Sequence, residues 1–302
     1  MGLALGDALC APYEGGWIER SLWYIIGKTK KGKARFTDDT QMAIDVARSL
    51  IANNGVNQDH LAQTFARSYR WSRGYGPSAR QILKKIRSGS HWSEVNTLRH
   101  PTGSFGNGAA MRIAPVALLY ARHPNLLKEA VKQVSAITHA HPWGIEGVQL
   151  IAHIIHASLL AKHQGTSAIA IAKSGEQICE SDRFRFLMQQ VVEWLEQSAK
   201  DVDHIPAQKV RQSLGNGMAA TASCATAVYV GLIFKDHPFL ELVNFVRQIG
   251  GDTDTIAAMA GAIWGAYRGI NAIEPQMIEH IEKGQMLLEL GLELHNLYTQ
   301  RQ

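Results

Sequence analysis

The chain has 302 residues, and a composition of 46% hydrophobic and 19% charged residues is enough to bury one large core or two smaller ones. Its 31 Lys and Arg residues exceed its 26 Asp and Glu residues, so the formal net charge is +5. The densest basic segment is the short one at residues 28–31, which excludes a polybasic nucleic-acid-binding tail. The small positive excess is compatible with an anionic ligand such as a phosphate ester.

Cysteine usage and apolar patterning predict the compartment. Cys10, Cys179 and Cys224 are widely spaced and form no CxxC pair, which indicates neither a disulfide framework nor a structural zinc site. The N-terminal residues lack the basic region of a signal peptide, and no apolar stretch approaches the roughly 20 uninterrupted residues that span a bilayer. We expect a cytoplasmic monomer with one domain over residues 1–302 and with no nucleic-acid or membrane partner.

Helical periodicity runs along the whole chain. Apolar residues recur at helical spacing in six segments: residues 41–52, 109–120, 145–161, 184–195, 223–233 and 256–267. Strand signals are scarce, and the Asn-Gly pairs at 107–108 and 216–217 lead into helical segments rather than hairpin strands. The sequence therefore predicts an all-α protein.

Two short segments concentrate carboxylates and hydroxyls before predicted helices: Phe-Thr-Asp-Asp-Thr at 36–40 and Gly-Gly-Asp-Thr-Asp-Thr at 250–255. One interpretation is helix capping, because Thr37 or Asp38 followed by Gln41 fits a capping box. The other is a metal site, because adjacent acids repel one another unless a cation or protons neutralise them. If the two helix starts converge, their oxygens would suit Mg²⁺ or Mn²⁺ better than zinc.

The glycine-rich segment 103–112 and Glu14 can each be interpreted as structural or as functional. The glycine-rich segment 103–112 matches neither a P-loop nor GxGxxG, yet N–H groups at a helix start can hold a phosphate. A connecting turn would show the same residues. Glu14 follows an apolar helix beside glycines, where a solvated loop acid is the ordinary outcome.

Seven segments carry a resemblance when they are taken together and in order. They are GLALGDALCAPYE (2–14), FTDDTQMAI (36–44), RGYGPS (73–78), GSFGNGAAMRIAP (103–115), TH (138–139), LGNGMAA (214–220) and GGDTDTIAAMAGAIWGAYRG (250–269). The chain thus resembles the ADP-ribosylglycohydrolase family, which includes the dinitrogenase-reductase-activating glycohydrolases and the ADP-ribosyl-acceptor hydrolases. The last segment is the most specific of the seven.

The resemblance implies a compact, orthogonal all-α bundle with a binuclear Mg²⁺ or Mn²⁺ centre at the bottom of a central ADP-ribose cleft. The implied metal ligands are Thr37, Asp38, Asp39, Asp252, Asp254 and Thr255. Glu14 falls at the position of the catalytic acid. The implied substrate-binding residues are Ser104, Gly106, Asn107 and Gly108 on a phosphate-binding loop, with His139 beside the distal ribose and pyrophosphate. Met218 stands where many relatives carry an aromatic residue that can stack on adenine.

The implied activity is metal-dependent hydrolysis of the glycosidic bond between ADP-ribose and an acceptor, which would be a modified serine or arginine of a protein. The segments at 214–220 and 250–263 look more like the serine-directed branch, but acceptor choice depends on the rim of the cleft. Two alternatives stay open, a hydrolase of free ADP-ribose conjugates and a non-catalytic ADP-ribose-binding protein. The complete set of acids favours an enzyme.

Overall fold

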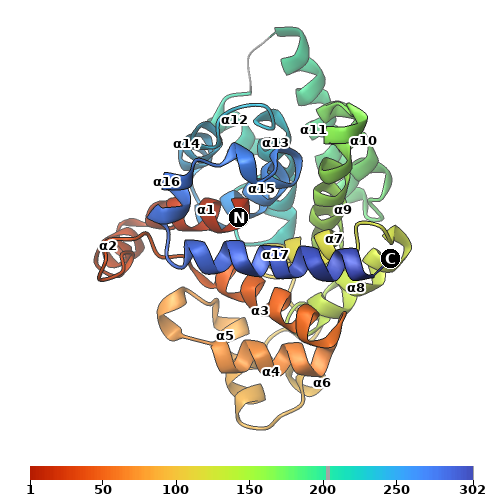
Figure 1. Cartoon of the computed structure of the whole chain (residues 1–302). Helices are drawn as coiled ribbons and strands as arrows, with labels where there is room; N and C mark the ends of the chain where they lie inside the picture. The colour runs from red at the N-terminus through yellow and green to blue at the C-terminus, as the bar shows by residue number, and fades with distance from the viewer. Residues whose placement is uncertain (202–204, 302) are drawn as a thin grey trace.

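The computed structural model describes residues 1–201 and 205–301, and this part of the chain is built of helices joined by turns (Figure 1). Within it, β-structure is limited to isolated bridges. The all-α prediction is confirmed. The α-helices are α1 (Gly2–Cys10), α2 (Trp17–Ile26), α3 (Asp38–Asn53), α4 (Gln58–Ser68), α5 (Pro77–Arg87), α6 (Trp92–Val95), α7 (Ala114–Leu119), α8 (Pro124–Ala136), α9 (Pro142–Gln164), α10 (Ala168–Gln177), α11 (Asp182–Asp201), α12 (Ala207–Ser213), α13 (Cys224–Ile233), α14 (Phe239–Ile249), α15 (Thr253–Arg268), α16 (Pro275–His280) and α17 (Gly284–Gln300). The 3₁₀ helices are η1 (Ala11–Tyr13), η2 (Trp71–Arg73), η3 (Ala220–Ala222) and η4 (Ile270–Ala272).

Five of the six predicted helical segments coincide with α3, α9, α11, α13 and α15, and the sixth is only partly helical. The segment predicted at 109–120 forms turns as far as Arg112, and α7 begins at Ala114 with Pro115 in its first turn. The N–H groups of Ala110 and Met111 both bond back to the carbonyl of Asn107. The prediction that both Asn-Gly pairs lead straight into helices is therefore wrong.

Helix α15 forms the centre of the core, and α1 packs against it (Figure 1). Two glycines of α1 permit this close approach. A Cβ on Gly6 would lie 2.1 Å from the carbonyl oxygen of Ala257, and a Cβ on Gly2 would lie 2.1 Å from that of Gly261. Because the two backbones touch, the start of α15 lies beside the residues that follow α1.

Helix α9 is a long apolar helix that also packs against α15. By length and composition it could cross a membrane, but 61% of its most apolar window is buried inside the fold. Glu146, Gln149 and His153 interrupt its apolar residues, so α9 is not an uninterrupted apolar stretch. A core helix passes the same test of length and composition.

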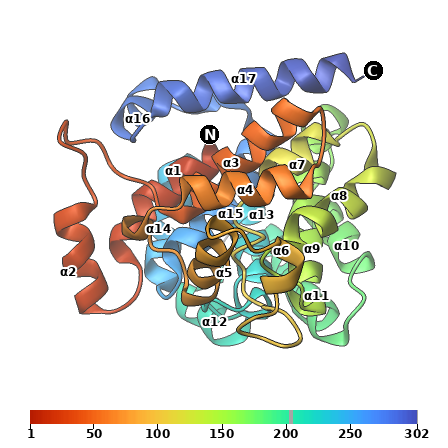
Figure 2. The same cartoon turned by 90° about the horizontal axis from the view of Figure 1, so that it is seen from below.

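Two helices lie on the outside of this core. Helix α17 crosses over α3 and α7, whereas α2 projects away from the other helices (Figure 2). Just before α17, Glu282 accepts two 2.8 Å hydrogen bonds from the buried guanidinium of Arg73, which also donates to the carbonyl of Phe36. This ion pair holds the segment that enters α3.

Candidate functional site

A buried carboxylate in α1 positions the first acidic segment. Asp7 accepts hydrogen bonds from the backbone N–H groups of Thr37 and Thr40, at 3.0 Å each, and from the Thr40 hydroxyl. Thr37 caps α3, since its Oγ1 accepts from the N–H of Asp39 at 3.3 Å. These contacts place Asp38 and Asp39 in the first turn of α3.

A tight glycine turn positions the second acidic segment. Gly251 has φ +79°, and a Cβ there would lie 2.2 Å from the carbonyl oxygen of Asn216. The same carbonyl accepts a 2.9 Å hydrogen bond from the N–H of Asp252. Asp252 is the residue before α15, and Asp254 lies in its first turn.

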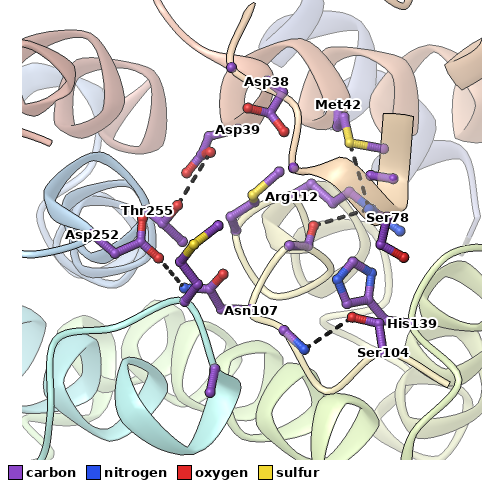
Figure 3. Close-up of a pocket in the computed structure, with 18 of the residues that line it drawn as sticks. Asp38, Asp39, Met42, Ser78, Ser104, Asn107, Arg112, His139, Asp252 and Thr255 are labelled. Carbon is purple, nitrogen blue, oxygen red and sulfur yellow. Dashed lines mark hydrogen bonds between the residues drawn. The ribbon is translucent and has the colours of Figure 1, made fainter. Parts of the chain in front are cut away.

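The two acidic segments converge on one pocket of about 280 Å³ (Figure 3). Carboxylate oxygens of Glu14, Asp252 and Asp254 lie within 4.8 Å of one another. The Thr255 hydroxyl donates to Asp39 Oδ1 at 3.4 Å and so links α15 to α3. Residues separated by more than 200 positions in the sequence therefore form one cluster of carboxylate and hydroxyl oxygens.

The four aspartates of this cluster lie close together and are buried. Burial first, and then the neighbouring carboxylates, raise the pKa of Asp38, Asp39 and Asp254 well above the ordinary value. Burial also raises the pKa of Asp252, while a hydrogen bond from Asn107 opposes the rise. Among the described residues, no Lys, Arg or His nitrogen lies within 4.0 Å of these four aspartates. Asp39 Oδ2 and Asp254 Oδ1 are buried without a hydrogen-bond partner in that same part of the chain.

The glycine-rich loop at 103–108 lines the pocket beside the acidic cluster. Asn107 fixes the loop, because its side-chain amide donates to Asp252 Oδ2 at 2.7 Å and to Ser223 Oγ at 2.9 Å. Its backbone N–H donates to the carbonyl of Met218. The Gly106 N–H donates to Ser104 Oγ at 3.3 Å, whereas the Gly108 N–H has no protein acceptor among the described residues.

His139 faces the same pocket opposite the acids. Figure 3 places Asp39, Asp252 and Thr255 on one side of the pocket, and His139 on the other side near Ser78 and Ser104. The imidazole is 7% exposed, and Gly106 and Gly108 leave room for it. An added Cβ would lie 3.3 Å from Nε2 at Gly106 and 3.1 Å at Gly108.

The structure brings together nearly all the side chains singled out in the sequence. Eleven of these residues line the pocket: Glu14, Asp38, Asp39, Ser104, Gly106, Asn107, Gly108, His139, Asp252, Asp254 and Thr255. Thr37 is the exception. It caps α3, and its hydroxyl donates to Asp39 Oδ1 at 3.2 Å. Gln41 does not complete a capping box, because its amide donates to Asp45 instead.

Sequence reasoning missed three supporting residues, Asp7, Arg112 and Thr138. Asp7 carried a signal, since it is a lone acid in an otherwise apolar helix. Arg112 and Thr138 lie within quoted segments, but their mutual 2.8 Å contact joins residues 26 positions apart. Local patterns do not predict such a contact.

Comparison with known proteins agrees with this geometry. A model of the ADP-ribosylglycohydrolase family matches residues 1–302. ADP-ribosylhydrolase ARH3 of Gallus gallus is 30% identical, with 99% of this chain and 92% of the relative covered. ADP-ribosylhydrolase ARH3 of Xenopus tropicalis is also 30% identical, with 100% and 95% covered. A solved structure described as an ADP-ribosylglycohydrolase-related protein complex has a TM-score of 0.63 at 22% identity, with 98% and 95% covered, and shows the same fold.

A helical fold with an acidic pocket and a glycine-rich loop thus defines this protein as a glycohydrolase enzyme. The chain belongs to the ADP-ribosylglycohydrolase family, as the resemblance of its seven segments implies.

Proposed function

We propose that this enzyme is a divalent-metal-dependent hydrolase that removes ADP-ribose from a modified side chain of a protein, with serine and arginine as the acceptors to be tested. One observation carries the proposal. Carboxylates of Glu14, Asp252 and Asp254 gather within 4.8 Å in a pocket that the glycine-rich loop also lines. One end of the pocket therefore suits a cation and a sugar, and the other suits phosphates.

The residues present fit Mg²⁺ or Mn²⁺, and we propose two ions. The ligand atoms offered are carboxylate and hydroxyl oxygens, which hard divalent cations prefer. The unpartnered buried oxygens of Asp39 and Asp254 would gain a partner. The proposed ligands are Asp38, Asp39, Asp252, Asp254 and Thr255, with Thr37 completing the set from the cap of α3. When bound, the ions would supply Lewis-acid polarisation and would orient the ribose hydroxyls.

Glu14 is the proposed catalytic acid–base. It is half-buried at the edge of the cluster, whereas the aspartates around it are buried. Cleavage of the anomeric bond develops oxocarbenium character at the ribose carbon and requires a positioned water and help to the leaving group. From this position Glu14 can take a proton from the water or give one to the departing acceptor atom.

The other end of the pocket would hold the diphosphate and adenine. The Gly108 N–H and the imidazole of His139 are donors for phosphate oxygens. Asn107 would act by holding the loop against Asp252, since its amide is already bonded. Phe105 and Met218 are exposed on the lining and offer apolar contact to a base. The binding energy of these contacts, which lie away from the reacting bond, would hold the ribose in position for reaction.

The test is hydrolysis of serine-linked and arginine-linked ADP-ribosyl peptides with Mg²⁺, with Mn²⁺ and after chelation. Glu14→Gln and Asp252→Asn should lose activity, whereas Glu279→Gln is the matched control, because Glu279 is exposed and does not line the pocket. Turnover that survives both the chelator and Asp252→Asn would overturn the metal proposal.

The same assay separates the alternatives. Turnover of small ADP-ribose conjugates without any turnover of either peptide would overturn the protein acceptor. Tight ADP-ribose binding with full metal content and no turnover on any substrate would establish a non-catalytic binding protein instead.

A further inference from the structure

A buried hydrogen-bond chain runs behind the glycine-rich loop. The Arg112 guanidinium donates from Nη2 to Thr138 Oγ1 at 2.8 Å, and Thr138 Oγ1 lies 2.8 Å from His139 Nδ1. Arg112 has no exposed surface, and no carboxylate lies within 4.0 Å of it among the described residues. Its Nη1 donates to the carbonyl of Gly108 at 3.0 Å. One guanidinium therefore supports both the loop and the histidine.

The directions of these bonds follow from the groups involved. A guanidinium only donates, so Thr138 Oγ1 must accept from Arg112. The Thr138 hydroxyl proton then needs an acceptor, because the side chain is buried and an unsatisfied hydroxyl is costly. His139 Nδ1 is the acceptor in place. The hydrogen bond at one ring nitrogen sets which nitrogen carries the proton, so the proton of the neutral imidazole lies on Nε2.

Nε2 is directed at the loop. It has no hydrogen-bond partner among the described residues, and the Cβ position at Gly108 lies only 3.1 Å from it. The N–H of Gly108 also lacks an acceptor in that part of the chain. Two unused donors thus belong to residues that contact each other and line the same pocket, where an anionic oxygen could accept from both.

We propose that Thr138 and Arg112 are positioning residues that fix His139 as its Nε2–H tautomer, so that Nε2–H and the Gly108 N–H hold one non-bridging phosphate oxygen of the diphosphate. This inference rests on the proposed function, because the diphosphate is that of ADP-ribose. Burial, and then the positive charge of Arg112, lower the pKa of His139 to about 3, which keeps the ring neutral. A neutral ring has one donor, and its position therefore decides whether phosphate is attracted or repelled.

The test compares Thr138→Val, which removes the hydroxyl at nearly constant shape, with Thr138→Ser, which retains it. ¹⁵N NMR of the histidine rings reports the tautomer in ligand-free protein, and His139→Gln assigns the signal by its loss. We expect the Nε2–H form in the wild type and in Thr138→Ser, and a mixture of both neutral tautomers in Thr138→Val, because the hydroxyl that donates to Nδ1 is gone. Calorimetry with ADP-ribose should show binding about tenfold weaker in Thr138→Val only, while adenosine binds all three proteins alike.

An Nδ1–H signal in the wild type would overturn the inference, even if Thr138→Val fails to fold. Equal ADP-ribose affinity of the Val and Ser variants, or equal weakening of adenosine binding, also does so. The tautomer is read without ligand, so failure of the proposed function is distinguishable: the Nε2–H signal would then be present while ADP-ribose does not bind to the wild type.

Discussion

The side-chain amide of Asn107 donates a 2.7 Å hydrogen bond to Asp252 Oδ2. This contact joins the glycine-rich loop to the acidic cluster across 145 positions of sequence. The same amide also reaches Ser223, so its orientation is fixed from two sides. A carboxylate held in this way presents its remaining oxygen lone pairs in one direction, which is how outer partners orient the ligands of a metal site.

Asn107→Ala should therefore lower activity more than stability. Loss of the donor frees Asp252 to rotate, and loss of such a partner typically costs 10–100-fold in activity or metal affinity. Ser223→Ala is the matched control, because it removes the other partner of the amide and leaves the Asp252 contact. Hydrolysis rates and metal titration would measure both variants, and equal rates for Asn107→Ala and wild type would contradict the prediction.

Asp254→Asn should be more stable than wild type without metal and less stable than wild type with metal. In chelator, Asp254→Asn should unfold at a higher temperature than wild type, since one buried negative charge is gone, with a gain of roughly 1–3 kcal/mol. Added Mg²⁺ should raise the melting temperature of the wild type and leave that of the variant nearly unchanged. Glu279→Gln, at an exposed site away from the pocket, is the control for thermal melting. A variant less stable than wild type in chelator would exclude this account.

Asp45 should make stability fall with rising pH. Burial raises the pKa of this carboxyl from 3.8 to about 6, against hydrogen bonds from Ser68 and Gln41. Between those two values the folded state holds a proton that the unfolded state has lost, so stability decreases as pH rises through this window. Asp45→Asn removes the ionisation. Its stability relative to wild type should increase by up to about 3 kcal/mol from about pH 4 to about pH 7.

Denaturant unfolding of both proteins at several pH values measures this difference. Because wild type and variant share every other titrating group, subtraction isolates Asp45. A difference that does not change with pH would show that the carboxyl titrates normally.

Gly6→Ala should destabilise the core, because a Cβ would lie 2.1 Å from the carbonyl oxygen of Ala257 and would push α1 away from α15. Overpacking of this kind costs about 1–3 kcal/mol. Gly291→Ala on α17 is the matched control, since nothing lies within 4 Å of its Cβ position and alanine favours helix by about 0.5–1 kcal/mol. Opposite shifts in melting temperature are expected. A neutral Gly6→Ala would mean that the two helices can separate freely.

The sequence predicts the individual helices well and the contacts between them poorly. The period of α3 and the Gly-Gly-Asp start of α15 are local features, so both helices follow from spacing. Convergence of Asp39 and Thr255 depends on the mutual packing of α1, α3 and α15, which no local pattern encodes, and only the family resemblance implied it. The turns after Asn107 show the apolar spacing of a helix, because apolar residues can face a core through turns as readily as through a helix.

The contact between Gly6 and Ala257 also constrains when the protein can fold. During synthesis, the ribosome makes α1 (Gly2–Cys10) long before it makes the partner helix α15 (Thr253–Arg268). Until then the apolar residues of α1 lack most of the native surface on which they pack. Contacts between residues this far apart in sequence slow folding, and the exposed apolar segments can form non-native contacts in the meantime. We therefore expect nascent chains of this protein to depend on chaperones until α15 has left the ribosome.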